Sequence, residues 1–283
     1  MQLVKAAMIG DVVGEFGLKT LETKLPALIK EENLDFVTVN GENAAEGFGM
    51  TENDYKRIIT AGADVVTSGN HVWEKREFWN ILKTEDRMLR PANYPENPDI
   101  TQGISGNGIA IVNKNRVRWI VINLQGREMM SAIDCPFQCF ERLKKIYEDK
   151  AADNHPLFEF DGNFIQSALP IILIDFHAES TREKEALAHY ADGRASIIAG
   201  THTHVQTADE KILPKGSAFI TDLGMTGNSD SVIGMDPKIC LDRARKNVLY
   251  HMEPALCETE GQMQGIIAEI DTKTSLAVSI KRI

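Results

Sequence analysis

Short apolar runs that end in polar, glycine-containing loops recur in the first third of this chain, and segments with helical spacing separate them. The apolar runs lie at 3–9, 35–40 and 64–68. Strands that alternate with helices in this way pack into a sheet of parallel strands, because each helix crosses back over the sheet. The pattern predicts an α/β fold, with Pro26 as a kink or an early end of the first helix at 18–30, and Thr51 as the N-cap of the second.

The rest of the chain predicts a mixed architecture. The apolar runs 109–112 and 117–124 flank Asn113–Arg116 as a hairpin, and a second hairpin is expected to end the chain. Between them we expect further strands and helices, together with a polar surface insertion at 153–163. No internal repeat, low-complexity tract or linker interrupts the 283 residues, so residues 1–283 are expected to form a single domain.

Charge and composition restrict the partners. The formal net charge is -10 and the chain has no Lys/Arg block, so no long nucleic acid is expected. A small anionic substrate is still allowed, because bound cations can dominate the local charge. No apolar run approaches the roughly 20 residues that a membrane span needs, and none has the form of a signal peptide, so no membrane association is expected.

The four cysteines are too few and too scattered for a disulfide framework. They favour a reducing compartment, so we predict a cytoplasmic protein. Cys135 and Cys139 lie about one helical turn apart. They are either a redox pair or plain thiols.

Polar residues that can bind metal ions follow five of the predicted strands. They are Asp11, Glu42, Asn43, Asn70, His71, His177, His202 and His204. In an open α/β sheet, ligands bind outside the carboxyl ends of the strands. Each residue has an ordinary alternative, such as a helix cap for Asp11, a turn for the asparagines or a rim position for His177. The coincidence at all five strand ends argues for one site, and His202 and His204 would face the same side of an extended segment.

This donor set predicts two divalent metal ions. Imidazole nitrogens mixed with carboxylate and amide oxygens suit Fe or Mn, with Zn as a further option, rather than Ca²⁺ or Mg²⁺. If Glu42 bridges, one ion takes Asp11, Asn43 and His204, and the other takes Asn70, His177 and His202. Two such ions would leave the site with a net charge of about +1, which attracts a phosphodiester.

The motifs that carry these residues resemble those of a known family. Gly10–Gly14, Asn40–Asn43, Gly69–His71, Asp175–Glu179 and Gly200–His204 are similar to the motifs of calcineurin-like metallophosphoesterases. The chain most resembles the bacterial branch of 2′,3′-cyclic-nucleotide phosphodiesterases, which has Val13 and Glu42 where most of the superfamily has His and Asp. The resemblance implies a four-layer sandwich of two mixed β-sheets flanked by helices, with metals at the strand ends, and in several members homo-oligomers.

The expected enzyme is a hydrolase in which a hydroxide that bridges two metal ions attacks the phosphorus while His71 acts as general acid. Asp175 and Glu179 either orient a ligating imidazole or serve as ordinary strand-edge and helix-cap charges. Two other functions are compatible with the same metal core. One is a phosphomonoesterase or nucleotidase, and the other is a non-catalytic, metal-dependent regulator that binds a nucleotide or a protein.

Overall fold

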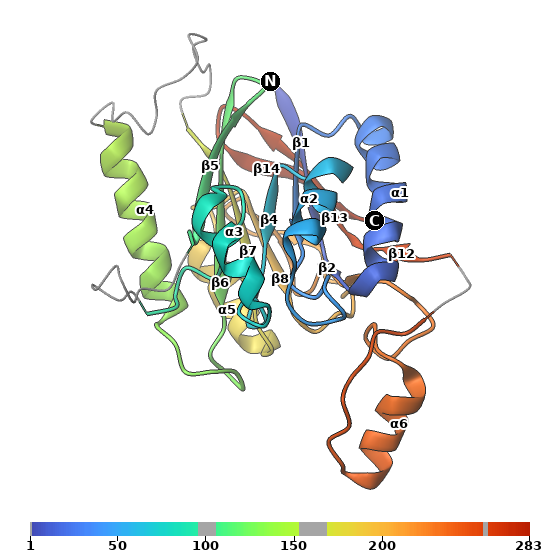
Figure 1. Ribbon diagram of the computed structural model, residues 1–283. Helices are drawn as coiled ribbons and strands as arrows, with labels where there is room; N and C mark the ends of the chain where they lie inside the picture. The colour runs from blue at the N-terminus through green and yellow to red at the C-terminus, as the bar shows by residue number, and fades with distance from the viewer. Residues whose placement is uncertain (1, 96–105, 153–168, 257–259) are drawn as a thin grey trace.

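The computed structural model describes residues 2–95, 106–152, 169–256 and 260–283, and the predicted polar insertion at 153–163 lies outside them. Figure 1 shows strands of the first and last parts of the chain side by side at the centre, with helices on both sides. The predicted mixture of strands and helices is confirmed.

The first sheet combines the N-terminal βα units with the C-terminal hairpin. Its strand order is β14-β13-β1-β3-β4. The strands are β1 (Leu3–Ile9), β3 (Phe36–Asn40), β4 (Val65–Thr67), β13 (Gly265–Asp271) and β14 (Leu276–Arg282). Strands β1, β3 and β4 run parallel, whereas β13 is antiparallel to both β1 and β14. The C-terminal hairpin therefore completes the sheet that the N-terminus begins.

The second sheet has the order β5-β6-β7-β8-β10-β9. Its strands are β5 (Ile109–Lys114), β6 (Val117–Gln125), β7 (Ile171–His177), β8 (Ile197–Thr201), β9 (Lys211–Ile212) and β10 (Ala218–Ile220). The four central strands are parallel and both edge strands are antiparallel. The turn between β5 and β6 is shorter than predicted, because Asn115 and Arg116 alone adopt positive φ values of 54° and 62° and the strands pair up to Lys114.

A third, small sheet was not predicted. It has the order β12-β11-β2, with β2 (Asp11–Val12), β11 (Met225–Gly227) and β12 (Gln262–Met263). Strands of two or three residues are too short to show an alternating pattern in the sequence. This sheet fixes Asp11 in extended backbone directly after β1.

The helices α1 (Gly14–Glu32), α2 (Glu52–Ala61) and α3 (Trp79–Thr84) come from the first third of the chain, and the 3₁₀ helix η1 (Arg76–Phe78) precedes α3. Pro26 lies inside α1, so the predicted early end of that helix is wrong. The predicted cap of α2 is confirmed, since Thr51 and Asp54 bond each other's backbone N–H groups.

Three further helices follow along the chain, α4 (Pro136–Ala152), α5 (Thr181–Ala191) and α6 (Pro237–Lys246). Helix α6 was not predicted. It projects away from the sheets, and none of its residues is buried.

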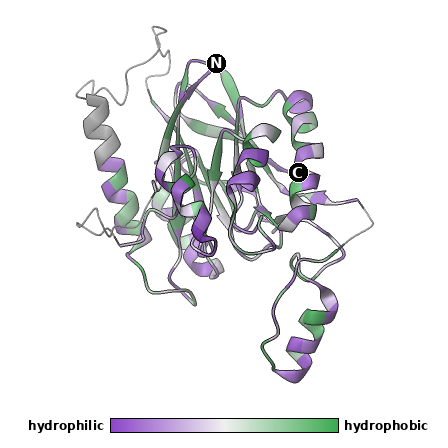
Figure 2. Cartoon of the chain, viewed as in Figure 1, coloured by the Kyte–Doolittle hydropathy of each residue, from purple (hydrophilic) through white to green (hydrophobic). Residues whose placement is uncertain are grey.

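The sheets and helices form four layers. On β1, Ala7 and Ile9 pack with the apolar faces of α1 and α2, whereas Ala6 and Met8 pack against the second sheet. Between the sheets, the rings of Phe36 and Trp119 stack with centroids 4.6 Å apart. A third apolar cluster joins the other face of the second sheet to α4 and α5. Figure 2 shows the strands as mainly hydrophobic and the helices as mixed, which is typical of sheets buried between helical layers.

Within the described part of the chain, no helix combines the length and apolar character that crossing a membrane requires. Cys135 and Cys139 are not joined by a disulfide.

Candidate metal centre

The candidate residues lie together where strands of both sheets end. Strands β1, β3 and β4 of the first sheet lead to Asp11, to Glu42 and Asn43, and to Asn70 and His71. Strand β7 of the second sheet ends at His177, and β8 leads to His202 and His204. The structure thus brings together all eight residues that the sequence singled out.

His177 is at the centre of this cluster and is fully buried. Its Nε2 lies 2.9 Å from Glu42 Oε1, 3.2 Å from Asn70 Oδ1 and 2.9 Å from His202 Nδ1. A single ring proton cannot satisfy three polar atoms at once. Donor atoms of Glu42, His177 and His202 all lie within 4.8 Å of one another, an arrangement that can hold a metal ion.

The tautomer of His177 is set by a chain of hydrogen bonds. The Thr201 hydroxyl donates to Asp175 Oδ1 at 2.7 Å, so it accepts from His177 Nδ1 at 3.0 Å. In the neutral ring, Nε2 then carries the lone pair. Asp175 therefore orients the imidazole through Thr201, a relay that the sequence did not reveal.

Three buried oxygen atoms in the cluster have no hydrogen-bond partner within the described residues. They are Asp11 Oδ1, Glu42 Oε1 and Asn43 Oδ1, of which Glu42 Oε1 forms an ion pair with His177 Nε2 only when that ring is protonated. The side-chain amide of Asn43 donates from Nδ2 to Gly47 O at 3.0 Å. This hydrogen bond sets the orientation of the amide, so that Oδ1 is the atom without a partner among the described residues. Unsatisfied buried acceptors are costly, and a cation satisfies all three. The residues present therefore fit divalent metal ions.

Gly69 makes room for this cluster. A Cβ atom at this position would collide with the His177 imidazole and the Glu42 carboxylate. Glycine is thus required by close packing, since the backbone after β4 passes directly against two candidate ligands.

Without a cation, the cluster binds protons instead. Burial raises the pKa of Asp11 to about 7. For His177, burial opposes the charged ring, but the Glu42 carboxylate outweighs it and raises the pKa to about 9. Burial and the nearby His177 lower the pKa of His202 to about 3. Burial also opposes ionisation of Glu42, yet the His177 ring lowers the pKa of that carboxyl to about 2.

The backbone from His202 to His204 is not extended, so that part of the prediction is wrong. His202 has φ 100° and His204 has φ 62°, both in the left-handed region that side chains rarely adopt. The two rings still face the cluster because, in each ring, one nitrogen contacts an oxygen atom outside the cluster. Glu179 Oε2 lies 3.3 Å from His202 Nε2, and His204 Nδ1 donates to Ile233 O at 2.8 Å. His204 Nε2 then lies 3.7 Å from Asp11 Oδ1.

A buried ion pair supports this strained segment and was not predicted. Lys184 Nζ donates to Asp222 Oδ2 at 2.7 Å, and both side chains are almost inaccessible to solvent. The same carboxylate accepts from the backbone N–H and the hydroxyl of Thr203, at 3.2 and 2.7 Å. A lysine on the apolar face of the helix at 181–191, beside Leu187 and Ala188, is the sequence signal that pointed to such a pair.

A cavity of about 330 Å³ opens onto the cluster. Its polar lining includes Glu42, Asn43, His202 and His204, and His71 lies at the same cavity with a quarter of its side chain exposed. The backbone N–H of His71 donates to Glu42 Oε2 at 3.2 Å. Its ring Nδ1 lies 3.2 Å from Glu74 Oε1. His71 therefore lies beside the cluster and faces a space that a substrate can enter.

Comparison with known proteins agrees with this geometry. Residues 7–283 match the family described as YmdB-like protein. The chain is 41% identical to the 2′,3′-cyclic-nucleotide 2′-phosphodiesterase of Bacillus subtilis (strain 168), over 99% of this chain and 96% of the relative. It is similar to the structure of a phosphatase from Mycoplasma pneumoniae, with TM-score 0.85 and 29% identity over 100% of this chain and 93% of the other. The structure of a hypothetical protein from Thermus thermophilus gives TM-score 0.81 and 33% identity over 99% of this chain and 98% of the other.

The chain therefore belongs to the YmdB-like family. Its sandwich is that of the calcineurin-like metallophosphoesterases, as the sequence motifs predicted. It is a hydrolase of phosphoric esters, and the family and the buried donor cluster together imply that it uses divalent metal ions.

Proposed function

We propose that this protein is a two-metal phosphodiesterase that hydrolyses 2′,3′-cyclic nucleotides. The observation that carries the proposal is a set of three buried oxygen atoms, on Asp11, Glu42 and Asn43, that accept no hydrogen bond among the described residues when the neighbouring His177 ring is neutral. The name of the Bacillus subtilis relative supports the choice of substrate.

Glu42 would lie between two ions. Asp11, Asn43 and His204 would hold one, and Asn70, His177 and His202 would hold the other. The 3.7 Å separation of His204 Nε2 from Asp11 Oδ1 supports the first group, and the three polar atoms around His177 Nε2 support the second. Fe or Mn suits this mixture of nitrogen and oxygen donors, with Zn as a further option. When bound, such ions lower the pKa of water and neutralise charge that develops on the phosphoryl group.

His71 would donate a proton to the leaving oxygen. Its backbone N–H is anchored on Glu42 and its ring lies at the cavity, so the imidazole is held close to the phosphoryl position. Glu74 faces Nδ1, which leaves Nε2 as the nitrogen that can donate to the leaving group. The chain's own contribution is therefore to position the metals, the substrate and one mobile proton.

A diester fits the cavity better than a monoester. No lysine or arginine is among the described residues that line it, and Glu179 adds a negative charge. A phosphomonoester near neutral pH carries more negative charge than a diester and needs more compensation. The same cavity also argues against a purely regulatory role, because a binding module does not need an imidazole beside its metals.

The test is hydrolysis by metal-free protein titrated with Mn²⁺, with bis-p-nitrophenyl phosphate, p-nitrophenyl phosphate and 2′,3′-cyclic AMP as substrates. We expect Mn²⁺-dependent turnover of both diesters, slower turnover of the monoester, and no turnover by the Glu42→Gln variant. Faster monoester hydrolysis would favour a phosphomonoesterase. Two bound ions without turnover of any substrate would favour a regulator.

A further inference from the structure

One side of the 330 Å³ cavity is apolar, and the phosphoryl chemistry does not use it. We define the apolar wall as Phe48, Ile233, Met235 and Met252, which line the cavity together with the candidate ligands. Phe48 comes from the loop after β3, and the other three come from the segments on either side of α6. An aromatic ring, two thioethers and a branched aliphatic chain form a surface suited to a flat apolar group.

The apolar wall is built into the metal centre. Met235 packs with Val13 and Met225 in a small cluster that also contacts Phe48 and Met252. The Phe48 ring meets the His71 ring edge-on, with centroids 5.0 Å apart. The wall is thus in contact with the proposed proton donor.

Ile233 ties the same wall to His204. It has a φ of 52°, which is unusual for a β-branched residue, and its carbonyl accepts from His204 Nδ1. Such strain is held only where the surroundings enforce it, and it is typical of binding sites. The strained turn therefore both holds a candidate ligand and presents an apolar side chain to the cavity.

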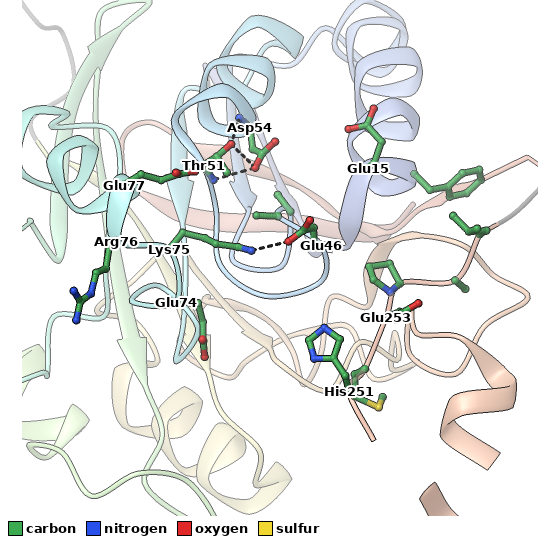
Figure 3. A pocket seen from close by; sticks show the side chains of 17 residues that line it. Glu15, Glu46, Thr51, Asp54, Glu74, Lys75, Arg76, Glu77, His251 and Glu253 are labelled. Atoms are coloured by element: carbon green, nitrogen blue, oxygen red, sulfur yellow. Dashed lines mark hydrogen bonds and ion pairs between the residues drawn. The ribbon is translucent and has the colours of Figure 1, made fainter. Parts of the chain in front are cut away.

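The neighbouring space is unsuited to further phosphates. A larger cavity of about 910 Å³ shares Met252 with the first one. Figure 3 shows it ringed by carboxylates, from Glu15, Glu46, Asp54, Glu74, Glu77 and Glu253. Lys75 and Arg76 also line it, but Lys75 pairs with Glu46 at 2.8 Å and the Arg76 guanidinium lies 6.0 Å from the centroid of the Trp79 ring, so the six carboxylates outnumber two cations. A substrate that extends in this direction with a second phosphate meets like charge.

We propose that the apolar wall binds the nucleobase of the substrate, and that the acidic cavity beside it restricts the enzyme to substrates with a single phosphate. This inference rests on the proposed function and specifies its substrate as a cyclic mononucleotide rather than an oligonucleotide. The small cavity has the volume of a modest ligand site, at the lower end of the usual range of about 300–1,000 Å³. Phe48 is then a specificity-determining residue.

The first experiment compares 2′,3′-cyclic AMP with ribose 2′,3′-cyclic phosphate, which has the same reacting group and no base. In the Mn²⁺-loaded wild type we expect a KM about tenfold lower for the nucleotide, since stacking of one base on an aromatic side chain gives effects of about this size or larger. Phe48→Ala should remove that advantage, so that KM for the nucleotide rises to the value for the base-free substrate. The matched control is Leu249→Ala, an apolar residue near α6 that is 88% exposed and does not line the cavity.

Equal KM values for the two substrates in the wild type would overturn the proposal. An equal loss on both substrates in Phe48→Ala would also overturn it, because Phe48 would then act on His71 or on folding. A dinucleotide that ends in a 2′,3′-cyclic phosphate carries a second, internal phosphate. It should be turned over at least about tenfold less efficiently than 2′,3′-cyclic AMP, and equal efficiency would refute the part assigned to the acidic cavity.

A binding measurement separates this inference from the proposed function. Calorimetry with adenosine 3′-monophosphate and with inorganic phosphate tests the wall even in a protein that turns over no substrate. Tighter binding of the nucleotide, lost in Phe48→Ala and kept in Leu249→Ala, would support the wall. Equal binding of the two ligands would overturn it, whatever the enzyme hydrolyses.

Discussion

Two fully buried aspartates beside the segment Thr201–His204 have opposite surroundings. Asp222 accepts hydrogen bonds from Lys184, from Thr203 and from the backbone N–H of Gly224 at 2.9 Å. Asp11 accepts only a long bond of 3.4 Å, from the His202 backbone N–H to Oδ2, and its Oδ1 has no partner among the described residues. The same chemical group is thus saturated in one place and unsatisfied in the other.

The different surroundings of the two aspartates indicate different roles: Asp222 supports the backbone of the site, whereas Asp11 is a candidate metal ligand. Asp222 holds Thr203, which lies between two candidate ligands, and its charge is compensated within the protein. Asp11 is desolvated without full compensation, a cost that persists in a fold only where a ligand offsets it. A substitution at Asp11 should therefore weaken metal binding and stabilise the metal-free fold, whereas removing the cation that pairs with Asp222 should destabilise the fold.

The largest effect is expected for Asp11→Asn. Loss of a ligand carboxylate should lower kcat/KM for diester hydrolysis by about 10⁴-fold, well beyond the roughly 10–100-fold typical of a lost supporting partner. The metal-free variant should unfold at a higher temperature than metal-free wild type at pH 8, because it no longer buries a carboxylate whose pKa is raised to about 7. As the pH falls from 8 to 5 the wild-type carboxyl gains its proton, so this difference should shrink. A metal-free variant less stable than wild type at pH 8 would contradict this account of Asp11.

Lys184→Met should act on the fold instead. The substitution leaves Asp222 charged and buried without its cation, so the free energy of unfolding should fall by about 3–5 kcal/mol in urea denaturation. Lys211→Met is the matched control, because its pair with Glu185 is exposed and long, at 3.8 Å, and should contribute about 1 kcal/mol or less. If both variants lost the same stability, the buried pair would not be the support inferred here.

His71→Ala should have a smaller effect that depends on the leaving group. We expect a loss of about a hundredfold in kcat for 2′,3′-cyclic AMP, because an alkoxide leaves poorly without a proton. For bis-p-nitrophenyl phosphate the loss should be several-fold at most, since p-nitrophenolate leaves without protonation. Metal content, measured by plasma emission spectrometry, should stay at the wild-type level. An equal loss on both substrates together with loss of metal would make His71 a ligand rather than the acid.

The sequence predicted the fold well where elements are long and regular. The apolar runs that end at Asp11, at Asn40 and near His177 correspond to β1, β3 and β7, and the motifs at their ends indicated the four-layer sandwich. It did not predict β2, β11 or β12, because two or three residues carry no periodicity. Helix α6 was missed because none of its residues is buried, and Cys240 is its one residue that packs, partly buried, against an apolar cluster of the body.

The site was predicted as a set of residues but not as an arrangement. The residues after β8 were expected in extended backbone, whereas His202 and His204 both have positive φ. What holds them there depends on contacts with residues distant in the sequence, including the Lys184–Asp222 pair and the carbonyl of Ile233. Such contacts leave little trace in a single sequence. The cytoplasmic location, the homo-oligomer and the single domain stay predictions.

The smallest expected effect is the proton count of metal binding, and it tests the unsatisfied cluster most directly. In the metal-free protein at pH 7, His177 with a pKa of about 9 is protonated and Asp11 with a pKa of about 7 is half protonated. Both must lose their protons to bind a cation, so Mn²⁺ binding at pH 7 should release about one to two protons. Affinity should therefore rise with pH between 6 and 9 and fall as protons return to Asp11 and His177.

Calorimetry in two buffers of different ionisation enthalpy measures the number of protons that Mn²⁺ binding releases. Asp11→Asn should reduce the number of released protons by about half a proton, because the asparagine amide has no proton to lose on metal binding. Lys211→Met should leave it unchanged, since that residue lies on an edge strand away from the candidate ligands. Binding without proton release at pH 7 would mean that the buried oxygens of the cluster already have partners in solution, and the contrast between Asp11 and Asp222 would then be absent from the protein in solution.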